Sequence, residues 1–202
     1  MANPDAPFGA RRIRNKSGTQ PTTLNTYMIA NAYATSIFYG DWVKTTTDGT
    51  LVIATAGDAV RGVFHGCNYV DAAGVPVFSK SWTASTATLG SAGARALVDD
   101  DPTGIFEMQS DGSMTSADVG QYCDIDTSQT GTATTGSKQQ TSATGGGEDN
   151  FKIIGIYGVD PYEKPCRNAA GNQDMLAGGT NAVVLISIVN HELGGSGVGV
   201  EV

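Results

Sequence analysis

The chain has 202 residues, a mass of 20.8 kDa, a net charge of −8 and only 16% charged residues. This length suits one good-sized domain with its own core. Glycine, alanine and threonine together supply 73 residues, which disfavours a helical bundle and favours an all-β domain with many turns. An acidic body repels phosphates, so we expect no nucleic-acid partner. We expect no membrane partner either, because no apolar run approaches the ~20 residues of a membrane helix.

The first 26 residues differ from the rest in charge and pattern. Residues 1–20 carry four basic side chains against one acidic one, a net charge of +3, which leaves −11 for the remainder. Residues 1–26 also contain three prolines and little apolar periodicity, so we expect an extended arm. A basic arm on an acidic body suggests an acidic partner, either another protein or a neighbouring copy. The alternative is a frayed, solvated terminus.

From Tyr27 onward the sequence predicts a series of short strands separated by turns. Asp48-Gly49 predicts a hairpin between residues 43–46 and 50–54, since this dipeptide suits a tight turn. Further strand-like runs lie at 27–30, 35–39, 61–67, 75–79, 94–98, 105–109 and 121–126. In the last of these runs the residues alternate, which predicts Asp124 and Asp126 on a solvated face.

The second half of the chain contains long segments without strand character. Residues 127–150 lack any large apolar side chain, so we expect a loop or β-arm that becomes ordered against a partner. Apolar strands are predicted at 151–157 and 182–189, with a loop at 160–181 between them and a Gly-rich flexible tail at 194–202. The pattern indicates a single β domain over residues 27–193, an antiparallel β-barrel or sandwich.

Cysteine and histidine patterns give little sign of chemistry. Cys67, Cys123 and Cys166 are far apart and odd in number, so we expect buried, reduced thiols and neither a disulfide framework nor a metal site. His65 could activate Cys67 as a nucleophile. However, residues i and i+2 of a strand lie about 7 Å apart, which disfavours that pair.

Carboxylates and aromatic residues offer the remaining functional candidates. The run Asp99-Asp100-Asp101 before Pro102 is typical of a turn, with a calcium site as the alternative. Asp124 and Asp126 could act as an acid/base pair, but glycosidase carboxylates usually face each other from different elements. Trp42 and Trp82 could line a glycan-binding surface. Core packing is the competing interpretation for both tryptophans.

Several runs, in this order along the chain, resemble the capsid decoration (cement) proteins of tailed bacteriophages. The residues that carry the resemblance are 1–9, 33–41, 62–66, 77–82, 98–109, 118–120 and 184–191. The loop from Asp160 to Asn181 has no counterpart in this resemblance.

The resemblance implies an all-β, β-tulip-like body with an N-terminal extension and no catalytic residues, metal, cofactor or small-molecule substrate. It also implies a location on the outer surface of the phage head, the major capsid protein as partner, and a homotrimer. We expect the capsid contacts to include Phe8, Arg11, Arg12, Ile13 and Arg14. The alternatives are another β-type virion component, such as a head fibre base or tail-tube subunit, and a glycan-binding β-sandwich module.

Overall fold

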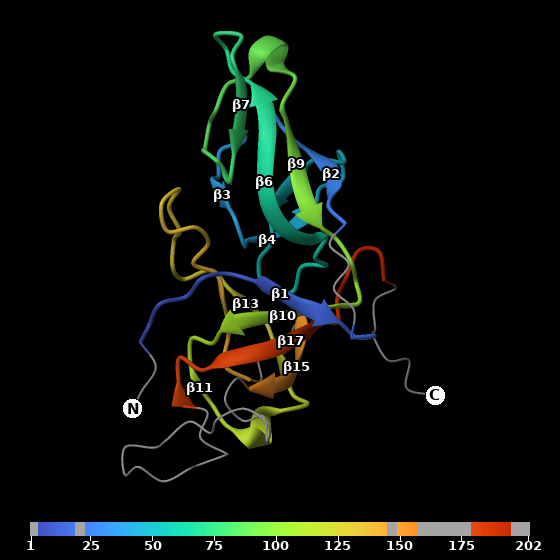
Figure 1. Ribbon diagram of the computed structural model, residues 1–202, viewed down its shortest axis with the longest axis vertical. Coiled ribbons are helices and arrows are strands. Elements are labelled where there is room, and N and C mark those ends of the chain that lie inside the picture. Colours follow the sequence, from blue (N-terminus) through green and yellow to red (C-terminus); the bar gives the residue numbers. More distant parts are fainter. Residues whose placement is uncertain (1–3, 19–22, 145–148, 157–178, 195–202) are drawn as a thin grey trace.

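A computed structural model describes residues 4–18, 23–144, 149–156 and 179–194. Over these residues the regular structure consists of antiparallel β-strands and two short 3-10 turns, η1 (Leu89–Ser91) and η2 (Ser116–Asp118). In this part of the chain no helix has the length and apolar character needed to cross a membrane. The strands form two main sheets, one in each half of an elongated molecule (Figure 1).

The lower lobe in Figure 1 is built on a five-stranded sheet in the order β1-β10-β17-β15-β12. Its central strand β17 is rich in β-branched residues, as expected for a strand paired on both sides. Two short pairs, β11–β16 and β13–β14, extend this lobe. The strand bounds are β1 (Arg11–Asn15), β10 (Gly104–Gln109), β11 (Ser113–Met114), β12 (Tyr122–Cys123), β13 (Ile125–Asp126), β14 (Gln140–Thr141), β15 (Phe151–Ile156), β16 (Gly179–Thr180) and β17 (Val183–Ile188).

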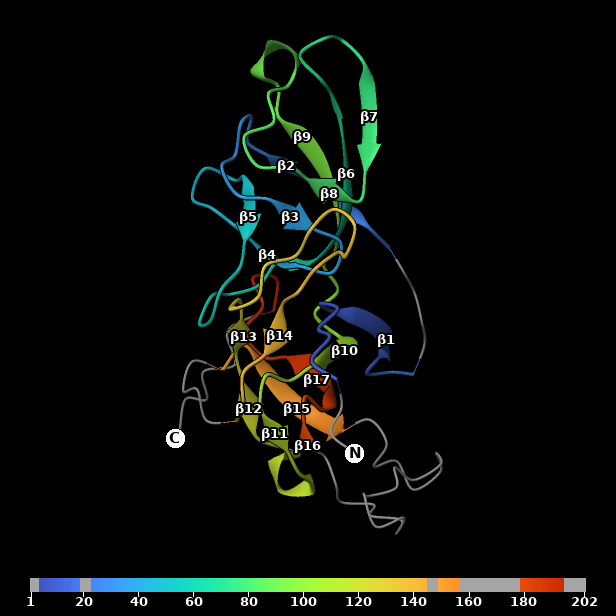
Figure 2. The same cartoon turned by 90° about the vertical axis from the view of Figure 1, so that its left-hand side faces the viewer.

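The upper lobe is built on a second sheet in the order β2-β9-β6-β4-β5. The strand β7 pairs with the C-terminal half of the long strand β6, and β3 pairs with β8 on the core side of this sheet (Figure 2). The strand bounds are β2 (Asn25–Ile29), β3 (Ile37–Phe38), β4 (Trp42–Thr45), β5 (Leu51–Ile53), β6 (Gly62–Val70), β7 (Pro76–Ser79), β8 (Ser81–Trp82) and β9 (Ala94–Asp99).

Each lobe has its own apolar core, and two strands of the upper sheet contribute to both. Successive side chains of a strand point to opposite faces. In β4, Trp42 packs in the lower core while Val43 packs in the upper one. In β6, Val63 and Phe64 divide in the same way. Trp42 contacts the rings of Phe106 and Phe151 at centroid distances of 4.9 and 4.7 Å, so the two lobes share packed side chains.

Much of the predicted strand pattern is confirmed. The Asp48-Gly49 turn joins β4 and β5, with Gly49 at a φ of +75° that this turn requires. The β6–β7 hairpin and the strands β9, β10, β15 and β17 lie close to their predicted ranges. The fold is all-β and antiparallel, but the sheets do not close into a barrel in the described part of the chain.

Three predictions differ from the structure. The boundary at residue 26 does not match the sheets, because β1 pairs with β10 and β2 pairs with β9. The predicted strand at 121–126 is split into β12 and β13. The loop at 127–150 contains β14 and several buried polar residues, so it contributes to the interior. The tail beyond Gly194 and most of the 160–181 loop lie outside the described residues.

Candidate functional site

Arg12, one of the predicted capsid contacts, is the centre of a buried ionic cluster. β1 places it beside the β9–β10 turn, where its guanidinium pairs with Asp99 and, at 2.5 Å, with Asp101. The side chains of Arg12 and Asp99 are only 7% and 0% exposed. Burial lowers the pKa of Arg12, but its hydrogen bonds to the two carboxylates outweigh this and raise it. Arg12 therefore connects the N-terminal segment to the body.

The other predicted contacts lie along the same segment with different exposure. The Arg11 guanidinium lies 4.1 Å from the centre of the Phe8 ring and 3.9 Å from Glu107. Ile13 sits at a bulge in the β1–β10 pairing and is half-buried, whereas Arg14 is exposed. Within the described residues β1 pairs with one strand, β10, and forms an edge of the lower sheet.

The carboxylates of the Asp99–Asp101 run form hydrogen bonds and ion pairs with other residues of the chain. Asp100 accepts hydrogen bonds from the Asn25 amide at 2.9 Å and from the Tyr27 hydroxyl. Burial and this bond raise the pKa of Tyr27. Asp101 accepts bonds from the backbone N–H and hydroxyl of Thr103, as in an Asx turn. The described ranges contain no group of three or more His, Cys, Asp or Glu side chains able to hold a metal.

Asp124 and Asp126 do not form the solvated pair that the sequence predicted. Asp124 is buried and accepts a hydrogen bond from the Asn150 backbone N–H at 3.2 Å. Asp126 accepts bonds from Ser128 and from the Gln140 side-chain amide. The alternation expected over residues 121–126 fails because the chain leaves one sheet at Asp124 and enters another.

The segment 127–150 supplies polar groups that bridge distant parts of the chain. The Gln139 side chain accepts a bond from the Trp42 backbone N–H at 2.6 Å and donates to the Ala54 carbonyl. The Asn150 side chain accepts bonds from the N–H groups of Gly57 and Ile125 and donates to the Asp58 carbonyl. These bonds were not predictable from a search for apolar core residues.

Both tryptophans are fully buried, which removes the basis for a glycan-binding surface built on them. The Trp42 indole N–H contacts the Met108 sulfur at 3.0 Å, and the Trp82 indole N–H donates to the Tyr33 carbonyl at 3.2 Å. An aromatic platform for a sugar would have to be exposed.

The predicted burial of Cys67 and Cys123 is confirmed. Cys67 and Cys123 are buried free thiols, and burial raises their pKa values to about 11 and about 12. Such thiols are poor nucleophiles at neutral pH. Cys166 lies outside the described residues. Burial lowers the pKa of His65, whose ring packs edge-on against Tyr39.

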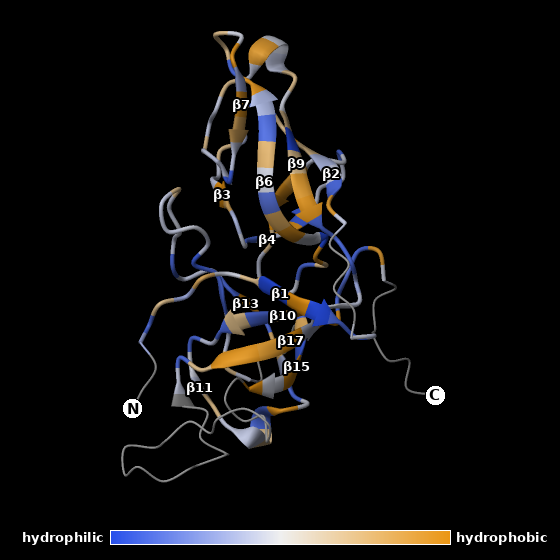
Figure 3. Ribbon diagram, viewed as in Figure 1, coloured by the Kyte–Doolittle hydropathy of each residue, from blue (hydrophilic) through white to orange (hydrophobic). Residues whose placement is uncertain are grey.

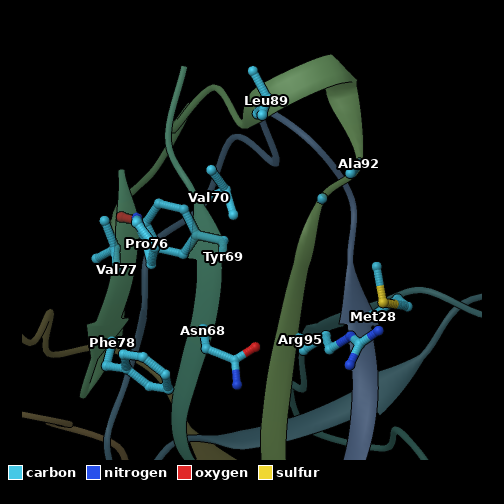
Figure 4. Close-up of a pocket in the computed structure, with 11 residues that line it drawn as sticks. Met28, Asn68, Tyr69, Val70, Pro76, Val77, Phe78, Leu89, Ala92 and Arg95 are labelled. Carbon is cyan, nitrogen blue, oxygen red and sulfur yellow. The ribbon is translucent and has the colours of Figure 1, made fainter. Parts of the chain in front are cut away.

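A second surface, which the sequence did not reveal, lies on the four adjacent strands β7-β6-β9-β2. The register places Phe78, Asn68, Arg95 and Met28 side by side in one row across these strands. The opposite side of the same strands packs on the upper core through Cys67, Ala96 and their neighbours. We call the outward side, with this row and Val70, Pro76 and Leu89 around it, the open face (Figure 4).

The open face is unusually apolar for a surface. Phe78 is 82% exposed, and Leu89, Met28 and Val70 are also more than a third exposed. Figure 3 shows apolar residues on β7, far from the apolar strand β17 of the lower core. A hollow of about 520 Å³ lies over these strands. Exposed apolar patches of this kind mark interaction surfaces.

Comparisons with protein-family models, with curated proteins and with solved structures find no match. The two surfaces above are therefore interpreted from their own geometry.

Proposed function

We propose that this chain is a structural virion protein, a capsid decoration (cement) protein. It binds the outer surface of a phage head and holds neighbouring major capsid protein subunits together against the pressure of packaged DNA. The sequence resemblance suggests this role. The single structural observation in its favour is that β1, an edge strand of the described sheet, carries the exposed basic side chains of Arg11 and Arg14 on an otherwise acidic chain.

The edge of β1 offers two kinds of contact to a capsid subunit. β1 is an edge strand of the described sheet, and edge strands are where an extended segment of a partner can add to a sheet. Arg11 and Arg14 lie along this edge and can pair with acidic groups there, since both are exposed. Phe8, stacked under Arg11, adds an apolar contact. Arg12 supports the edge from within and does not reach the partner, because its guanidinium is held by Asp99 and Asp101.

The polar groups described above are engaged within the chain. The buried Arg12 cluster, the turn carboxylates and the side chains of Gln139 and Asn150 all hold parts of the chain together. We propose no catalytic role and no cofactor for them. The resemblance implies a homotrimer, and a mass measurement distinguishes this assembly from others.

Charge reversal at the β1 edge tests the proposal. Deleting residues 2–16 would remove Arg12 and leave Asp99 buried without its cation, so the deletion would confound binding with folding. Arg14→Glu changes only an exposed side chain. The purified chain and this variant are mixed with emptied, expanded heads of the encoding phage and sedimented.

We expect the wild type to saturate the heads at a fixed number of copies and Arg14→Glu to bind at least tenfold more weakly. Lys80→Glu, a charge reversal at an exposed site in the upper lobe, is the matched control and retains binding. A wild-type chain that does not bind the heads refutes the proposed function. Equal binding by Arg14→Glu refutes the β1 contact alone.

A further inference from the structure

The open face has a self-complementary order of side chains. Its central row reads Phe78, Asn68, Arg95 and Met28 across β7, β6, β9 and β2. This order is apolar, polar, polar, apolar. When two such rows face each other about a twofold axis along the strands, Phe78 lies opposite Met28 and Asn68 lies opposite Arg95. An isologous interface requires this kind of reciprocal match.

The chemistry of each facing pair is favourable. A methionine sulfur against an aromatic ring is a stabilising contact. The Asn68 amide oxygen can accept hydrogen bonds from the Arg95 guanidinium of the other copy. Among the described residues Arg95 has no carboxylate within ion-pair distance, so its donors are free for such a contact.

Charge also favours this face as the meeting point of two copies. The chain carries a net charge of −8, so most approaches between two copies bring acidic surfaces together. Among the described residues that line the hollow of the open face there is no carboxylate, and Arg95 is the one charged group. Repulsion between acidic groups of the described residues is therefore small at this hollow.

The exposed apolar side chains of the open face belong to one surface. Phe78, Leu89, Met28 and Val70 are 82%, 52%, 40% and 38% exposed and line the same hollow. Contiguous exposed apolar patches mark interaction sites on soluble proteins.

The two copies meet through the faces of their sheets and not by pairing along the edge strand β7. β7 is an edge strand with Pro76 at its start. Proline lacks the N–H group that a further strand would need, and it is a common protection of exposed edges. The large apolar side chain, that of Phe78, projects from the face itself (Figure 4).

We propose that the open face binds the open face of a second copy of this chain, forming a twofold dimer by stacking of the two β7-β6-β9-β2 sheets. This association is separate from capsid binding at β1 and differs from the threefold assembly that the sequence resemblance implies.

Sedimentation velocity of the full chain between 1 and 100 µM tests the proposal. We expect the wild type to form a species of twice the 20.8 kDa chain mass. Phe78→Ser removes two copies of the ring from each dimer. At about tenfold for each ring, the dissociation constant rises about 100-fold. Leu193→Ser, at a side chain that is 53% exposed outside the open face, is the matched control and leaves dimerisation unchanged.

A crosslinking experiment tests the register. Phe78→Cys and Met28→Cys variants, each also carrying Cys166→Ser, are treated with a bis-maleimide of about 10 Å, the usual spacing of stacked sheets. We expect a mixture of the two variants to crosslink and Met28→Cys alone, which keeps both Phe78 rings in its dimer, to crosslink far less. The buried Cys67 and Cys123 stay unlabelled. A wild type that is monomeric at 100 µM, a species of three times the chain mass, or an unchanged mass for Phe78→Ser would each overturn the proposal.

Discussion

Replacing Asp41 with asparagine removes a buried charge at the junction of the two lobes. Asp41 is 2% exposed in the turn between β3 and β4. Its carboxylate accepts a hydrogen bond from the Phe38 backbone N–H at 2.7 Å. Burial raises its pKa from the ordinary 3.8 to about 6, and hydrogen bonds from Ser137 and Phe38 offset only part of this effect. Asparagine keeps an oxygen acceptor of the same shape for the Phe38 N–H.

The pKa shift sets the size and the pH range of the effect. A shift of about two units corresponds to about 3 kcal/mol between the protonated and ionised forms. The folded state binds the proton more tightly than the unfolded chain does. The cost is therefore absent well below the unfolded pKa of 3.8, where both states are neutral, grows as the pH rises toward the folded pKa of about 6, and levels off above it. We expect Asp41→Asn to differ from the wild type by about 0.5 kcal/mol or less at pH 4 and to be more stable by 1–3 kcal/mol at pH 7.

Urea unfolding of both proteins at pH 4, 5, 6 and 7 measures this difference. The other carboxylates titrate in both proteins, so the difference between their unfolding free energies isolates Asp41. Asp48→Asn, at an exposed turn, is the control and changes stability by less than about 0.5 kcal/mol at every pH. A difference for Asp41→Asn that is the same at pH 4 and pH 7 would refute the assignment of a raised pKa to Asp41.

Two further substitutions test the groups that hold the chain together. Arg12→Met leaves the fully buried Asp99 without its cation, so we expect a loss of about 3–5 kcal/mol in urea unfolding at pH 7. Arg14→Met, at an exposed position of the same strand, changes stability by less than about 0.5 kcal/mol, and equal losses for the two would contradict the ionic cluster. Asn150→Ala removes three hydrogen bonds. It should cost about 2–4 kcal/mol and speed amide hydrogen exchange at Gly57 and Ile125, and unchanged exchange there would show that Asn150 does not bridge these segments.

The two surfaces differ in how much of each could be predicted from the sequence. The basic segment was visible as a charge excess, and the prediction placed five capsid contacts on it. Charge alone did not distinguish the buried Arg12 from the exposed Arg14. The fold pairs Arg12 with Asp99 and Asp101, which lie 87 and 89 positions further along the chain. In the sequence Phe78 looked like one more strand residue. Its exposure follows from β7 lying at a sheet edge on the uncovered side of the upper lobe.

By itself, the sequence determined the all-β class, the Asp48-Gly49 turn, the principal strands and the burial of Cys67 and Cys123. These features depend on backbone preferences and burial tendencies that act over a few neighbouring residues. Only the tertiary structure decided that β1 belongs to a sheet, that Trp42 and Val43 serve two separate cores, and that Phe78, Asn68, Arg95 and Met28 share one row. Such arrangements depend on which strands pair and in which register, and those pairings join residues far apart in the chain.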